Sequence, residues 1–171
     1  MAALDKNDEA QKDVDKALEL RPDLPQAILI RSLLAAEKKR FGEAIADLQT
    51  LLRADPTNVE YRLQMASYYT ADSRPRRAIE LLTNILADDE KNVQALRSRG
   101  DAYLSVSKHA EAIKDYELAM KEEPDDTGIL NNFAWVLATC PNDKVRDGKR
   151  AIEIATKACE MTKYSKPHIL S

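Results

Sequence analysis

A 34-residue repeat constrains this chain more than any other feature of its sequence. Alanine recurs at that step as Ala10, Ala44, Ala78 and Ala112. Two further columns, one of small and one of apolar residues, keep the same step: Ser32, Ala66, Gly100, Ala134 and Ala17, Leu51, Ile85, Ala119. Repeats of about 20–50 residues are the signature of structural units that stack to build a common core. We therefore expect an array of similar units.

Each unit is predicted to hold two helices, as residues 93–126 illustrate. Apolar residues there recur at the spacing of an amphipathic helix, which predicts a first helix from Val93 to Val106 and a second from His109 to Glu122. Pro124 follows the second helix and ends it, because proline lacks an N–H and disfavours helical geometry in the residue before it. The small residues of the repeat columns would let the two helix backbones approach closely.

Composition supports an all-α protein and excludes several other classes. Four glycines and seven prolines in 171 residues argue against a β fold with many turns. Aromatic residues make only 5%, so we expect an aliphatic core. The formal net charge of −3 gives no reason to expect nucleic-acid binding, and no apolar run reaches the roughly 18 residues of a membrane span.

The repeat resembles the tetratricopeptide repeat. Residues 93–126 carry Leu96, Arg99-Gly100, Tyr103, Ala112, Tyr116, Ala119 and Pro124 at the signature positions of that family. The resemblance implies an all-α fold in which antiparallel helix pairs stack into a right-handed α–α superhelix. It also implies a concave groove, lined by the first helix of each pair, in which protein or peptide ligands bind.

The period divides the chain into six segments, which we expect to form a single solenoid. The segments are 1–24 (second helix only), 25–58, 59–92, 93–126, 127–166 (with an inserted loop over 140–149) and 167–171 (the start of a further repeat). The insertion follows from Ala151, which lies 39 residues after Ala112 rather than 34. Both ends look cut, which suggests an internal piece of a longer repeat protein.

No arrangement of residues indicates a catalytic, metal or cofactor site. His109 and His168 lack neighbours at metal-ligand spacing, and no nucleophile, base and orienting group can be assembled. Asp143, Asp147 and Gly148 lack the alternating ligands of a calcium loop. We therefore predict a protein that is not an enzyme and has no cofactor. Cys140 and Cys159 are expected to be small buried residues, and acidic residues such as Asp115 to lie on solvated helix faces.

The groove positions supply the candidate binding residues. They are Leu29, Ile30, Leu33, Gln64, Arg97, Ser98, Asn131, Asn132 and Trp135. Leu29, Ile30 and Leu33 would make one section apolar, and their helix is apolar nearly all round, so it should be buried on more than one side or contact a partner or a second copy.

Two alternatives stay open for the polar and aromatic candidates. The side chains of Gln64, Asn131 and Asn132 could pair with the backbone of an extended peptide, or could hydrate the surface. Trp135, the single tryptophan, could anchor a ligand, or could pack against the 140–149 loop.

We predict a non-catalytic scaffold that binds a protein or peptide segment, without nucleic acid and without membrane insertion of this segment. A purely structural spacer or oligomerisation arm, or the substrate-recruiting part of an enzyme whose catalytic domain lies elsewhere, are the alternatives. Self-association through exposed terminal repeats is a further expectation. The sequence leaves the compartment open, with a weak preference for the cytoplasm.

Overall fold

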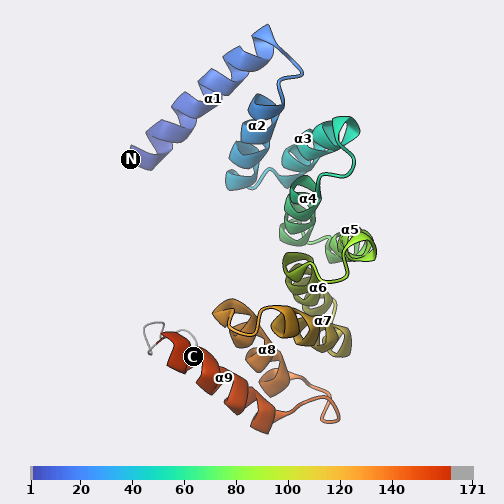
Figure 1. Ribbon diagram of the computed structural model, residues 1–171. Helices are drawn as coiled ribbons and strands as arrows, with labels where there is room; N and C mark the ends of the chain where they lie inside the picture. The colour runs from blue at the N-terminus through green and yellow to red at the C-terminus, as the bar shows by residue number, and fades with distance from the viewer. Residues whose placement is uncertain (1, 163–171) are drawn as a thin grey trace. The chain divides into compact units, whose positions relative to one another are not determined.

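The computed structural model describes the backbone of residues 2–162 and the side chains of residues 9–162. The expected repeat start at 167–171 lies outside the described residues. The described residues fold into α-helices: α1 (Ala2–Leu20), α2 (Pro25–Glu37), α3 (Phe41–Ala54), α4 (Val59–Ala71), α5 (Pro75–Asp88), α6 (Val93–Ser105), α7 (His109–Glu122), α8 (Thr127–Thr139) and α9 (Gly148–Thr162) (Figure 1). They divide into two compact units, which meet in the sequence between Ala78 and Ile79 and are described separately below.

Hydrophobic periodicity explains the helix bounds. The predicted helices over Val93–Val106 and His109–Glu122 are confirmed as α6 and α7, with a difference of one residue at one end. Ala95, Leu96 and Gly100 of α6 are buried, and Ala112 and Tyr116 of α7 are completely buried. The all-α prediction is confirmed over residues 2–162.

Neighbouring helices form antiparallel pairs within each unit. In the first unit α2 packs against α3, and in the second unit α6 packs against α7 and α8 against α9 (Figure 1). The small residues of the repeat columns permit this close contact between the two helices of a pair. Ser32 is completely buried against α3, where its hydroxyl donates to the Ala44 carbonyl oxygen at 2.9 Å.

Gly100 shows why one of these positions must be small. A Cβ atom at Gly100 would lie 3.1–3.3 Å from three carbon atoms of the Tyr116 ring. The ring of Tyr116 in turn lies 6.2 Å from that of Phe133, centre to centre, and both residues are completely buried. The expectation of a purely aliphatic core is therefore wrong for the second unit, because small residues on α6 leave room for an aromatic ring at its centre.

The turn inside a helix pair repeats with the same period. Lys39, Ser73 and Ser107 each adopt a left-handed conformation, with φ of 57°, 58° and 59°. In the last of these turns Lys108 N donates to Tyr103 O and Ser107 N donates to Leu104 O, both at 2.9 Å. These two bonds define a Schellman motif, which satisfies carbonyl groups at the end of α6.

Pro141 explains why the fourth pair is connected differently. It stands 34 residues after Ser107, and proline cannot reach positive φ. The chain instead leaves α8 in an extended conformation at Cys140, with φ −55° and ψ 124°. Residues 140–147 then connect to α9, and Asp147 N donates to Leu137 O at 3.0 Å.

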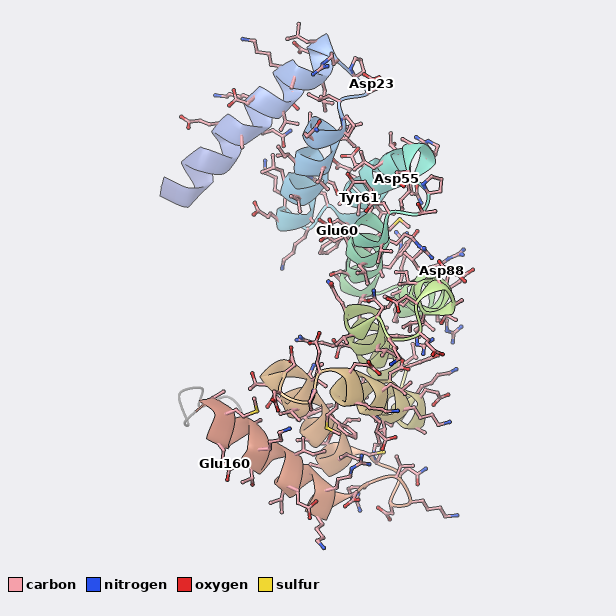
Figure 2. The ribbon with its side chains drawn as sticks, viewed as in Figure 1. Asp23, Asp55, Glu60, Tyr61, Asp88 and Glu160 are labelled. Atoms are coloured by element: carbon pink, nitrogen blue, oxygen red, sulfur yellow. The ribbon has the colours of Figure 1, made fainter. Side chains whose placement is uncertain are left out.

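The connections between pairs use side-chain caps. Asn58, Asn92 and Asp126 precede α4, α6 and α8, and each side chain accepts from the backbone N–H three residues later. Figure 2 shows Asp55, Glu60 and Tyr61 close to the passage from α3 into α4. There the Asn58 amide donates to Asp55 Oδ2 at 3.0 Å and Tyr61 N donates to Asn58 Oδ1 at 3.1 Å.

A bidentate ion pair joins the two helices in each of two helix pairs, α2–α3 and α6–α7. Arg99 donates to both carboxylate oxygens of Asp115, at 2.8 and 2.7 Å, and Arg31 does the same to Asp47, at 2.9 and 2.7 Å. Asp115 is only 3% exposed. The expectation that Asp115 lies on a solvated face is therefore wrong, because an arginine on the facing helix compensates its charge.

Candidate functional site

Two first helices of the second unit, α6 and α8, carry six groove positions in matching order. Arg97, Ser98 and Asp101 lie on α6, and Asn131, Asn132 and Trp135 lie 34 residues later on α8. Positions three and four residues apart lie on the same face of a helix, so the residues of each trio lie close together along one face.

These helices enclose a pocket of about 320 Å³ together with α7. The pocket is lined by Asp101, Leu104, Tyr116, Asn131, Asn132 and Trp135. Three of the predicted site residues, Asn131, Asn132 and Trp135, therefore line one cavity.

A hydrogen-bond network ties the three helices together at this pocket. The Tyr116 hydroxyl on α7 donates to Asp101 Oδ1 on α6, and Asn132 Nδ2 on α8 donates to the same oxygen at 3.2 Å. Asp101 is thereby held in one orientation. Its two hydrogen bonds within the described part of the chain both reach Oδ1.

Burial governs the electrostatics of this network. It raises the pKa of Asp101 above its ordinary value, although the bonds from Tyr116 and Asn132 and the charge of Arg97 act in the opposite direction. Burial, followed by the charge of Asp101, also raises the pKa of Tyr116. The phenol therefore stays protonated at neutral pH and acts as a donor to the carboxylate.

Arg97 lies beside the pocket rather than in its lining. Its guanidinium nitrogens lie 3.1 Å from the place that a Cβ atom of Gly128 would occupy, at the start of α8. Its charge favours the ionised form of the Asp101 carboxyl.

Trp135 exposes a large apolar surface at the pocket. The residue is 55% exposed, and its backbone carbonyl accepts a hydrogen bond from the Thr139 hydroxyl at 2.8 Å. More than half of the residue's surface is therefore open to solvent.

The remaining predicted residues lie elsewhere. Ser98 is partly buried on α6 and does not line the pocket. Leu29, Ile30 and Leu33 lie on α2 and Gln64 on α4, all in the first unit. Ile30 and Leu33 are each 43% exposed and Leu29 is partly buried, so α2 keeps an open apolar surface, although Ala27, Ile28, Leu34 and Ala35 are buried.

Three residues of the pocket are not among the predicted binding residues. Asp101 occupies a groove position one period before Trp135, and that spacing already places it on the predicted surface. Tyr116 was expected in the helix interface, where its ring does lie, but its hydroxyl also reaches the pocket. Leu104 forms part of the apolar wall, and no signal in the sequence distinguishes it from an ordinary core residue.

The acidic residues of the 140–149 segment and the two cysteines were the other candidates noted in the sequence, and their surroundings are those of ordinary structural residues. Asp143 pairs with Arg146, and Asp147 Oδ1 accepts from Arg150 N at 3.0 Å at the start of α9. Cys140 and Cys159 are both buried free thiols, as expected.

Across residues 9–162, no three His, Cys, Asp or Glu side chains gather closely enough to hold a metal ion. None of the described helices has both the length and the apolar character that crossing a membrane requires.

Three family models, each described as tetratricopeptide repeat, match residues 2–59, 35–100 and 93–126. A curated relative, DnaJ homolog subfamily C member 3 from Rattus norvegicus, is 30% identical over 123 residues. That match covers 70% of this chain and 24% of the relative, so the chain spans about a quarter of that protein's length.

Solved structures share the fold. MamA from Desulfovibrio magneticus RS-1 superposes with a TM-score of 0.77 at 16% identity, covering 94% of this chain and 88% of that one. YrrB, described as a TPR protein with an unusual peptide-binding site, gives a TM-score of 0.69 at 19% identity, covering 96% and 82%. Together with the family matches, these likenesses show that the chain belongs to the tetratricopeptide repeat family.

Proposed function

We propose that this chain is a non-catalytic scaffold whose second unit binds an extended segment of a partner protein at the α6–α8 pocket. The observation that carries the proposal is the meeting of two amides, a carboxylate and an exposed indole in one cavity. Ligand sites in proteins characteristically combine apolar walls with a few polar groups that fix orientation.

The two asparagines suit the backbone of a peptide. Asn132 uses its Nδ2 on Asp101, which fixes the amide and leaves its oxygen to accept a peptide N–H. The side chain of Asn131 makes no hydrogen bond to other described residues, so it offers both a donor and an acceptor. Recognition of this kind depends on the extended conformation of the ligand more than on its sequence.

Trp135 would supply most of the contact area. A tryptophan loses few rotamers on binding and buries a large surface, which is why it dominates many interfaces. The coarser function, a protein-interaction scaffold, agrees with the family matches. The peptide-binding site named for YrrB supports the finer proposal by analogy.

The first unit contains the other predicted binding residues. Leu29, Ile30 and Leu33 present an open apolar surface on α2, and Gln64 is partly buried on α4. We propose that this surface contacts a partner or a second copy. Light scattering at high protein concentration tests self-association, and a strict monomer would contradict it.

The pocket proposal is tested by selecting binders from a displayed library of random peptides against the full chain. Titration with a selected peptide should show at least tenfold weaker binding for Trp135→Ala, with a similar loss for Asn132→Ala. Ile152→Ala is the matched control, because Ile152 is 70% exposed on α9 and lies outside the pocket.

Thermal unfolding of the same variants separates binding from folding. If Trp135→Ala lowers only the melting temperature and leaves the affinity unchanged, the anchor role is wrong. If no peptide is enriched at all, the spacer alternative gains and the pocket proposal fails.

A further inference from the structure

The pocket is lined by one charged group, Asp101, and the nearby Arg97 compensates its charge only in part. Among its lining residues Asp101 alone is ionisable at neutral pH, and the others are amides, a phenol, an indole and a leucine. Both described hydrogen bonds to the Asp101 carboxylate reach Oδ1, which leaves Oδ2 without a described donor. A partly buried carboxylate with one open oxygen favours an incoming cation.

We propose that this pocket receives a lysine or arginine side chain of the bound segment, with its cationic head on Asp101 and its aliphatic stem along Trp135 and Leu104. The proposal rests on the peptide-binding function above and adds the chemistry of the ligand. A charge-assisted hydrogen bond to Oδ2 would complete the carboxylate's coordination.

The walls of the pocket suit such a side chain. Lysine and arginine have apolar stems that lie along apolar surface while the charged head reaches a polar group. The face of an indole attracts cations through its quadrupole, and tryptophan is the strongest of the aromatic residues in this respect. Trp135 and Asp101 stand one period apart on facing helices, so a single side chain can meet both.

The nearest resident cation does not occupy this position. Arg97 lies against Gly128, and its guanidinium nitrogens and Asp126 Oδ1 all lie 3.1 Å from the place that a Cβ atom of Gly128 would occupy. The raised pKa of Asp101 agrees with incomplete compensation, since the charge of Arg97 is among the weaker influences on it. An acidic ligand group facing Arg97 is the competing arrangement, and Asp101 would repel it.

The test uses the full chain and a phage-displayed library of random 12-residue peptides. We expect the enriched peptides to share one basic position, and replacement of that residue by norleucine to weaken binding at least tenfold. Exchange of lysine and arginine at that position distinguishes the two cations, and binding that survives either exchange fits the proposal.

Two variants of the chain test the carboxylate itself. Asp101→Asn should weaken binding of the basic peptides at least tenfold, since asparagine keeps an oxygen for Tyr116 and Asn132 but loses the charge. Glu153→Gln, which removes one negative charge from an exposed position on α9, should leave binding unchanged. Arg97→Gln should strengthen binding about threefold, because it removes a like charge beside the pocket.

The outcomes separate this inference from the proposed function. Enriched peptides that need Trp135 but share no basic residue, or that bind Asp101→Asn as well as the native chain, overturn the inference and leave the scaffold proposal standing. A shared acidic position, with binding lost in Arg97→Gln, overturns it in favour of an anionic ligand. Absence of any enriched peptide overturns both.

Discussion

The Arg99–Asp115 ion pair occupies two repeat positions that hold different residues in the preceding repeat. The corresponding positions one repeat earlier carry Met65 and Leu81, which are both apolar. Burial of an ion pair is costly, and breaking such a pair by removing one partner costs more than replacing both partners with apolar groups. The neighbouring repeat therefore provides a natural template for the double replacement.

Arg99→Met alone is predicted to lower the free energy of unfolding by about 2–4 kcal/mol, because it leaves the buried Asp115 carboxylate unpaired. The double variant Arg99→Met, Asp115→Leu should recover to within about 1 kcal/mol of the native chain. Urea denaturation of the three proteins measures both values. A double variant as unstable as Arg99→Met alone would contradict this account.

Gly100→Ala is predicted to destabilise the chain by about 1–3 kcal/mol, because the added Cβ presses on the buried Tyr116 ring. Gly42→Ala is the matched control, since a Cβ there meets nothing within 4 Å and alanine favours the helix by about 0.5–1 kcal/mol. Chemical denaturation should therefore give changes of opposite sign. Equal effects of the two variants would show that Tyr116 does not require the space.

Asp101 predicts a dependence of stability on pH. Since burial raises its pKa in the folded chain, its contribution to stability is complete below the ordinary pKa of an aspartate and is lost as the pH rises through the raised value. Tyr116, which donates to this carboxyl, has a raised pKa of its own and stays protonated across that window.

The free energy of unfolding of Asp101→Asn, measured relative to the native chain, should therefore increase with pH across this window and then level off. Denaturation at a series of pH values measures the difference. A difference that falls with pH would show that the carboxyl pKa is lowered and not raised. Affinity for a basic peptide should rise over the same window, as the carboxylate ionises.

At the scale of elements, the turns α2–α3, α4–α5 and α6–α7 each contain one left-handed residue. Ser107→Val is predicted to cost about 1–2 kcal/mol, because a β-branched side chain is strained at φ 59°. Ser107→Gly should be at least as stable as the native chain, since glycine adopts this conformation without strain. Thermal unfolding compares the two. A valine variant as stable as the glycine variant would contradict the role assigned to the turn.

The sequence predicted the helices well because their determinants are local. Periodic apolar residues, Pro124 and the spacing of Ala112 and Ala151 are sufficient to place α6, α7 and an altered connection before α9. Pro141 even supplies the physical reason for that connection, because the repeated turn needs a positive φ there.

The candidate site was predictable only in part. The 34-residue period shows which face of a helix a residue occupies, so it placed Asn131, Asn132 and Trp135 on the same predicted surface. It does not show which partner a side chain finds on another helix. The burial of Asp115 and the bond from Tyr116 to Asp101 both depend on such partners, so they required the structure.

At the scale of the whole molecule, the main helix contacts within each unit run between helices that follow one another in the sequence. In the second unit α6 contacts α7, α7 contacts α8 and α8 contacts α9. Ion pairs also link second helices and their flanking loops about one repeat apart, as in Arg150–Glu117 and Lys157–Asp125. Stability in such an array is a sum of local terms, so exposed faces remain available for binding without weakening the core.

The central claim is that this chain acts through the α6–α8 surface, and nuclear magnetic resonance tests it most directly. A selected peptide is titrated into the isotope-labelled full chain. We predict that the largest shift changes occur at the Trp135 indole N–H and at the side-chain amides of Asn131 and Asn132. Changes confined to other helices, with the Trp135 indole unaffected at saturation, would contradict the claim.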